Sequence, residues 1–188
     1  NGAPLEGDLA GVQHFYDRGV RYITLCHGKN NHICDSSFDP TRKWHGLSPF
    51  GRELIGEMNR VGMIVDISHV SDDTFYDVID LSETPVVATH SSCRHFTPGC
   101  ERNMSDDMIR ALAAKDGVMG INFGAIFLNE GMNRAFTKFK AEMEAYFKEH
   151  PTDDYAQKDR IVLQKRKAAD FGKAYLAMAF GLLGEAYE

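Results

Sequence analysis

Three histidines stand where short hydrophobic segments end: His27, His69 and His90. Each follows a run rich in β-branched and other apolar residues, which is typical of a buried strand. The carboxyl ends of neighbouring parallel strands lie at one edge of a sheet, about 4.8 Å apart, so imidazoles placed there can converge on one point. Because histidine is a common metal ligand that suits zinc at neutral pH, the pattern indicates a metal or catalytic site.

The number of such histidines decides between two interpretations. A single histidine at the end of a strand is usually a hydrogen-bonded packing residue, whereas three at equivalent positions favour a site. The remaining histidines fall on a helix face or in loops, and we expect them to be solvated: His14, His32, His45, His95 and His150.

Strand periodicity gives a further expectation about the histidines. Residues two apart in a strand lie on the same face of the sheet. The apolar residues that share a face with each histidine would then fill the interior of a barrel, and the histidines would lie at its end. The residues concerned are Val65 and Ile67 before His69, and Val86 and Ala88 before His90.

Arg102 lies in the loop after the His90 strand. Loops at this edge of a parallel sheet hold substrates, and an arginine there can bind a substrate carboxylate through two parallel hydrogen bonds. The alternative, which spacing alone favours, is a surface arginine paired with Glu101 or Asp106. No glycine-rich phosphate-binding loop and no Gly-x-Ser-x-Gly motif follows any strand, so nucleotide-dependent and serine-hydrolase chemistry have no support.

Alternating helices and strands must position these residues. Apolar periodicity predicts strands at residues 20–25, 63–68, 86–89 and 118–123. Helices are expected before each of them, at residues 7–18 and 49–61 and after the N-capping serines Ser71 and Ser105. This order is typical of an α/β protein with a parallel sheet. Four strands are half of a (β/α)₈ barrel, so the pattern fits either a small open sheet or a partial TIM-like barrel.

The character of the sequence changes after Asn129. We therefore expect two regions, 1–128 with the central βα units and 129–188 as a helical insertion or subdomain. Pro151 separates an amphipathic helix from a second helical stretch at residues 155–187.

Composition excludes several classes of protein. The 188 residues carry a net charge of −6 without a basic stripe, which argues against nucleic-acid binding. No apolar run is long enough to span a membrane. The four cysteines leave free thiols or one Cys93–Cys100 disulfide open. A homodimer is compatible with the sequence, and a periplasmic or secreted location is favoured over the cytoplasm.

Several ordered segments resemble the renal (membrane) dipeptidase family of zinc metallopeptidases, in its bacterial-type form. The resemblance covers about residues 7 to 128 and indicates a central fragment of the family's (β/α)₈ barrel. The segments are Gly19-Val-Arg-Tyr-Ile-Thr-Leu-Cys-His27, Gly46-Leu-Ser-Pro-Phe-Gly-Arg52, Met58-Asn-Arg-Val-Gly-Met-Ile-Val-Asp-Ile-Ser-His-Val-Ser71, Pro85-Val-Val-Ala-Thr-His-Ser-Ser92, Arg102-Asn103 and Gly120-Ile-Asn-Phe123.

The resemblance implies hydrolysis of dipeptides, often with a D-residue at the C-terminal position, by water activated between two zinc ions. It implies that His69 and His90 bind one zinc, that His27 binds the substrate and stabilises its tetrahedral intermediate, and that Arg102 holds the substrate carboxylate. The family's His-x-Asp pair, bridging glutamate and late aspartate have no counterpart here. The alternatives are another metal-dependent amidohydrolase, acting on lactams or N-acyl amino acids, and a non-catalytic homologue.

Overall fold

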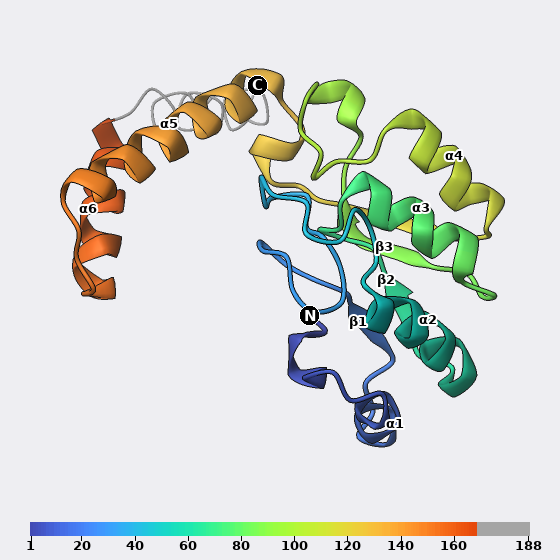
Figure 1. Cartoon of the computed structure of the whole chain (residues 1–188). Coiled ribbons are helices and arrows are strands. Elements are labelled where there is room, and N and C mark those ends of the chain that lie inside the picture. The colour runs from blue at the N-terminus through green and yellow to red at the C-terminus, as the bar shows by residue number, and fades with distance from the viewer. Residues whose placement is uncertain (169–188) are drawn as a thin grey trace. The chain divides into compact units, whose positions relative to one another are not determined.

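The computed structural model describes residues 1–168 and places four strands in one parallel sheet (Figure 1). Spatial order follows sequence order, from β1 (Tyr22–Thr24) through β2 (Ile64–Asp66) and β3 (Val87–Ser91) to β4 (Val118–Ile121). The predicted α/β class and parallel sheet are confirmed, although each strand is shorter than predicted or shifted by one or two residues. Closure into an eight-stranded barrel stays a prediction.

Helices make the crossovers between these strands. α1 (Ala10–Asp17) precedes β1, and α2 (Pro49–Val61), α3 (Asp72–Leu81) and α4 (Asp106–Ala114) connect successive strands. Short 3₁₀ turns lie at Ala3–Leu5, Arg94–Phe96 and Ala125–Phe127.

The helix boundaries follow local chemistry. Ser71 and Ser105 are N-caps as predicted, and their side chains accept from the backbone N–H groups of Thr74 and Met108. Gly62 ends α2 with a φ of +85°, a left-handed conformation that glycine adopts without steric cost.

The hydrophobic core lies between the sheet and its helices, and this corrects the expectation about strand parity. The residues expected in a barrel interior are instead buried in one cluster with side chains of α2 and α3. Its members include Val65, Ile67, Val86 and Ala88 from the strand segments, and Leu54, Met58, Phe75 and Val78 from the helices.

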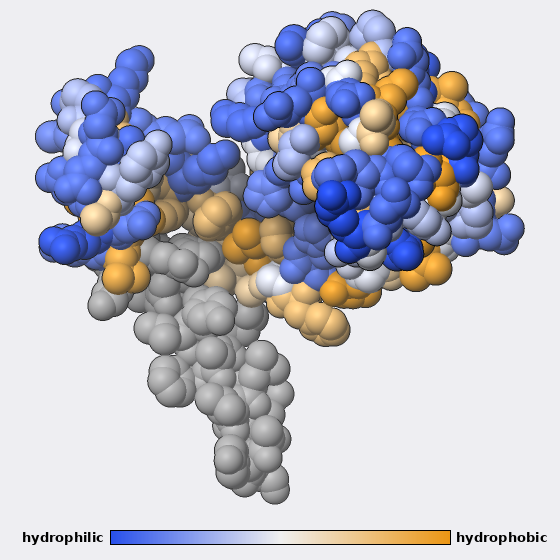
Figure 2. Space-filling view, turned by 90° about the horizontal axis from the view of Figure 1, so that it is seen from below, coloured by the Kyte–Doolittle hydropathy of each residue, from blue (hydrophilic) through white to orange (hydrophobic). Residues whose placement is uncertain are grey.

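The opposite face of the sheet carries the residues of the other parity, and large apolar side chains there are exposed. Tyr22, Ile64 and Val118 are 51%, 40% and 66% exposed. Strand alternation separates the residues into two faces of the sheet but does not show which face the helices cover. The prediction that Val65, Ile67, Val86 and Ala88 fill a barrel interior is therefore wrong. Figure 2 shows apolar residues interrupting an otherwise mostly hydrophilic surface.

A second compact unit begins at Gly124, after the first unit, Asn1–Phe123. It contains α5 (Glu130–Glu149), which buries Met132, Phe139 and Met143, and α6 (Tyr155–Ala168). The part of the predicted second helical stretch at residues 169–187 lies outside the described residues. None of the helices described in residues 1–168 combines the length and apolarity that a membrane crossing requires.

Candidate active site

The structure brings the three predicted histidines together. The Nε2 atoms of His69 and His90 lie 2.8 Å apart. The ring centroids of His27 and His69 are 4.3 Å apart, and those of His69 and His90 are 4.8 Å apart. His27 is exposed, while His69 is 8% exposed. The cluster therefore combines a partly buried pair of nitrogens with an imidazole that solvent can reach.

Unusual backbone directs His69 into the cluster. Its φ is +75°, in the left-handed region that non-glycine residues seldom adopt. The Ser37 backbone N–H and hydroxyl both donate to the His69 carbonyl, at 2.8 and 3.0 Å. Strand pairing becomes irregular between Ala88 and Ser91, just where His90 follows Thr89. Local departures from strand geometry, and not strand parity, thus aim both imidazoles.

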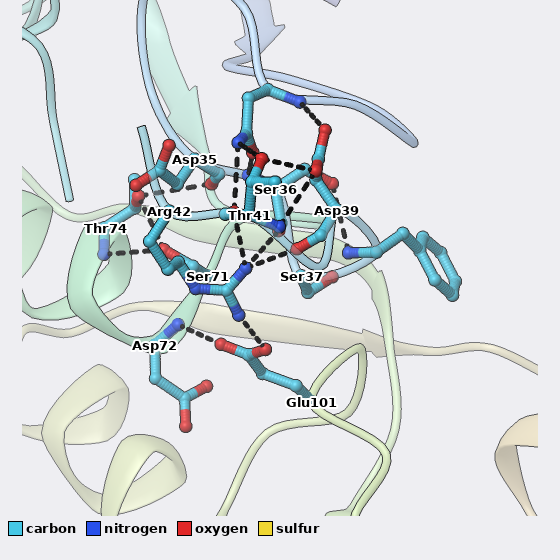
Figure 3. A network of polar contacts seen from close by, with 12 residues as sticks. Asp35, Ser36, Ser37, Asp39, Thr41, Arg42, Ser71, Asp72, Thr74 and Glu101 are labelled. Atoms are coloured by element: carbon cyan, nitrogen blue, oxygen red, sulfur yellow. Dashed lines mark hydrogen bonds and ion pairs between the residues drawn. The ribbon is translucent and has the colours of Figure 1, made fainter. Parts of the chain in front are cut away.

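The Ser37 contacts belong to a loop at residues 28–48 that is organised around a buried carboxylate. Asp35 is fully buried, and its carboxylate accepts from the backbone N–H groups of Lys43, Trp44 and Gly46. Its own carbonyl accepts from the N–H of Ser71 at 3.0 Å. Figure 3 shows Asp35 and Ser71 in this network. The loop is therefore tied to the N-terminus of α3, directly after the His69 segment.

An ion pair connects the same loop to the segment that carries Arg102. Arg42 pairs with one carboxylate oxygen of Glu101, and the other oxygen accepts from the Asp72 N–H at 3.1 Å (Figure 3). Asp72 in turn forms two hydrogen bonds with Arg94, at 2.6 and 2.7 Å. These contacts hold the loops around the histidines in one arrangement.

Arg102 is buried beside the histidines, at 4% exposure. Its guanidinium donates to the His90 carbonyl and, at 2.9 Å, to the Ser91 hydroxyl. Burial lowers the pKa of Arg102 to about 10. This value is still well above neutral pH, so the side chain is cationic there. Arg102 is therefore not the surface arginine of the alternative.

Hydrogen bonds from β1, from β3 and from the turn after β2 converge on Asp66, behind His90. Its Oδ2 accepts from the hydroxyls of Thr24 at 2.6 Å and Thr89 at 2.7 Å, and its Oδ1 accepts from the N–H groups of Ser68 and Thr89 at 3.0 Å. Burial acts to raise the pKa of Asp66, but these hydrogen bonds hold it below its ordinary value. The Thr89 hydroxyl also lies 2.7 Å from Nδ1 of His90.

The electrostatic environment keeps the two close imidazoles neutral. Burial, the charge of Arg102 and the neighbouring His27 lower the pKa of His69 to about 3. Burial and Arg102 likewise lower the pKa of His90 below its ordinary value. Both residues therefore offer a nitrogen lone pair at neutral pH, as metal ligation requires.

The facing nitrogens fit part of a zinc site. Two imidazole nitrogens bound at about 2.1 Å to one tetrahedral zinc lie roughly 3.4 Å apart, so only a small outward movement of the rings would admit the ion. Within residues 1–168 no three His, Cys, Asp or Glu side chains are arranged to hold a metal. The described residues therefore offer the facing nitrogens of His69 and His90 but no complete set of ligands.

Sequence patterns missed the residues behind the histidines. Asp66, Asp35 and Thr89 carry no predicted role, and Glu101 pairs with Arg42 where the sequence suggested Arg102. One signal was available, because a charged residue within an otherwise apolar strand segment is rarely fully buried without a role. All four cysteines are free thiols, and Cys26 and Cys34 are buried.

The sequence and the fold of this chain are similar to those of known dipeptidases. A family model described as membrane dipeptidase (Peptidase family M19) matches residues 1–164. Dipeptidase tcpJ of Claviceps purpurea is 42% identical over 130 residues, which are 69% of this chain and 30% of that protein. The uncharacterized dipeptidase C965.12 of Schizosaccharomyces pombe is 40% identical over 134 residues, 70% of this chain and 32% of that protein.

Solved structures from bacteria agree. The probable dipeptidase PvdM of Pseudomonas aeruginosa superposes with a TM-score of 0.67 and 29% identity, covering 77% of this chain and 38% of that one. A metallo peptidase from Rhodobacter sphaeroides, liganded with a phosphinate mimic of the dipeptide L-Ala-D-Ala, gives a TM-score of 0.60 and 32% identity over 66% of this chain and 36% of that one.

The chain spans about a third of the length of the curated relatives it matches. The family model nevertheless covers most of the chain, and the predicted resemblance to the renal dipeptidase family is confirmed. This chain belongs to the membrane dipeptidase family, Peptidase family M19.

Proposed function

We propose that the protein containing this chain is a zinc-dependent dipeptidase. The observation that carries the proposal is the 2.8 Å approach of the His69 and His90 Nε2 atoms, with His27 beside them and the Arg102 guanidinium bound to the His90 carbonyl. Two neutral imidazoles whose Nε2 atoms face each other suit zinc, which would replace the proton they share, and the relatives of this chain are named dipeptidases.

His69 and His90 would hold one of two zinc ions in the complete site. When bound, zinc supplies a Lewis acid for the scissile carbonyl and lowers the pKa of water toward neutrality. The remaining ligands would come from the other half of a (β/α)₈ barrel, because the sheet described here has four strands with exposed apolar residues on its open face.

His27 is proposed to bind the substrate and stabilise the tetrahedral intermediate. Its imidazole is exposed and lies against His69, so it can donate a hydrogen bond to an oxygen that gains negative charge next to the metal ligands. A preorganised donor of this kind typically contributes about 3–4 kcal/mol to transition-state stabilisation.

Arg102 is proposed to bind the free carboxylate of the dipeptide. Its buried positive charge lies near His69 and His90, where it lowers both pKa values. A free carboxylate lies beside the only peptide bond of a dipeptide, so this attraction would select for cleavage directly before a C-terminal residue, as in a dipeptide. The phosphinate mimic bound by the Rhodobacter enzyme supports a substrate with a D-residue at its C-terminal position.

Hydrolysis of a dipeptide panel by the full-length protein tests the proposal. We expect activity that a chelator abolishes and zinc restores, and that His69→Ala removes. His14→Ala is the matched control, because His14 lies exposed on α1 and bonds only to Arg18 among the side chains described. A folded, zinc-loaded protein that hydrolyses N-acyl amino acids or lactams but no dipeptide would favour the amidohydrolase alternative. The absence of bound zinc would favour a non-catalytic homologue.

A further inference from the structure

The hydrogen-bond network behind His90 fixes where one proton resides. The Asp66 carboxylate is fully buried and accepts four hydrogen bonds, from two hydroxyls and two backbone N–H groups. All four contacts require Asp66 to act as an acceptor, as an ionised carboxylate does. The Thr89 hydroxyl, 2.7 Å from Asp66 Oδ2, must therefore direct its one proton to Asp66.

The Thr89 oxygen is then left as an acceptor toward His90. Because it lies 2.7 Å from His90 Nδ1, that nitrogen must carry the proton. A neutral imidazole has only one N–H, so the lone pair of His90 is on Nε2. Nε2 is the atom that faces His69, at 2.8 Å. The hydrogen-bonded series Asp66–Thr89–His90 thus selects the Nδ1-protonated tautomer of His90. This tautomer directs the Nε2 lone pair to the place where a metal would bind.

We propose that Asp66 is a positioning residue that acts through the Thr89 hydroxyl to hold His90 in the Nδ1-protonated tautomer, with Nε2 directed to zinc. The inference rests on the proposed zinc site for its purpose, and on hydrogen-bond geometry for the tautomer. Outer-shell partners of this kind fix the orientation of a ligand and raise its basicity, and their removal commonly weakens metal binding about ten- to a hundredfold.

The sheet supplies a matched control for this proposal. Thr24 donates to the same oxygen of Asp66 at 2.6 Å, from the neighbouring strand, and its side chain forms no hydrogen bond with a histidine among residues 1–168. Valine has nearly the shape of threonine without the hydroxyl. Thr24→Val and Thr89→Val therefore each remove one hydroxyl bond to Asp66, but only Thr89→Val breaks the connection to His90.

The experiment compares full-length wild type with Thr89→Val, Thr89→Ser and Thr24→Val. Nitrogen-15 NMR of histidine-labelled, zinc-free protein reports the tautomer of His90. Competition with a chromophoric chelator reports zinc affinity. We expect a single Nδ1-protonated tautomer in wild type, Thr89→Ser and Thr24→Val. In Thr89→Val we expect mixed tautomers and zinc affinity lower by about ten- to a hundredfold.

Two results would overturn the proposal. One is an unchanged His90 tautomer in Thr89→Val, and the other is an equal loss of zinc affinity in Thr24→Val and Thr89→Val, which would indicate general destabilisation. The NMR measurement needs neither zinc nor dipeptide hydrolysis. If the protein binds no zinc, the proposed function fails, and the tautomer comparison still decides whether Asp66 orients His90.

Discussion

Asp35→Asn should loosen the loop that supports His69. The Asp35 carboxylate is fully buried, and its Oδ1 accepts from the N–H groups of Lys43 at 2.9 Å and Trp44 at 3.2 Å. Its Oδ2 accepts from Trp44 at 3.0 Å and Gly46 at 3.4 Å. Asparagine replaces one of these oxygens with an NH₂ group, which cannot accept.

The magnitude follows from the number of donors that lose their acceptor. With the amide in either orientation, one or two of the three N–H groups face another donor inside the protein. A hydrogen bond to a charged group contributes about 1.5–3 kcal/mol, so we expect Asp35→Asn to lower the free energy of unfolding by about 2–5 kcal/mol. The Ser37 contacts to the His69 carbonyl lie two residues away, so zinc affinity should fall as well.

Urea denaturation of the full-length protein, followed by circular dichroism, measures the loss. Hydrogen–deuterium exchange of peptides from residues 28–48 localises it, because the loop should exchange faster in the variant than in the wild type. Asp39→Asn is the matched control, since Asp39 accepts from Asn30 and Thr41 in the same loop but is far less buried. A loss below about 0.5 kcal/mol, or one no larger than that of Asp39→Asn, would refute the reasoning.

Three further predictions concern the core, the sheet and the thiols. Phe75→Ala removes a fully buried side chain and should cost about 3–5 kcal/mol in urea denaturation, so a loss below 1 kcal/mol would mean that the core is not packed as described. Gly120→Ala places a Cβ 2.4 Å from the Thr89 carbonyl oxygen and should lower stability by about 1–3 kcal/mol; an unchanged melting temperature would contradict the pairing of β3 with β4. Burial raises the pKa of Cys34 well above its ordinary value, so iodoacetamide at pH 8 should alkylate the partly exposed Cys100 first, as peptide mass spectrometry can verify; equal rates would show that Cys34 is accessible.

Local signals predicted the main elements of the fold because each has a short-range cause. Ser71 and Ser105 cap helices through their own hydroxyls, and Gly62 ends a helix by adopting a positive φ. The helix-strand alternation then requires crossovers, which make the sheet parallel. Contacts of this range depend on a few neighbouring residues, so the sequence alone reveals them.

Parts of the site depend on contacts that sequence periodicity cannot report. His69 was expected to follow strand parity, but its φ of +75° is stabilised by Ser37, which lies 32 positions earlier. Asp66 gains its partner Thr89 only when two strands pair in register. The positions of the histidines at strand ends were thus predictable, whereas the groups that orient them depend on tertiary structure.

We expect His69 and His90 to bind the same zinc ion. Anomalous diffraction at the zinc absorption edge, from crystals of the full-length protein grown with zinc, would locate that ion. An anomalous peak should lie within about 2.2 Å of Nε2 of both residues. Zinc bound elsewhere, or a zinc-saturated crystal in which the two nitrogens remain hydrogen-bonded to each other, would contradict it.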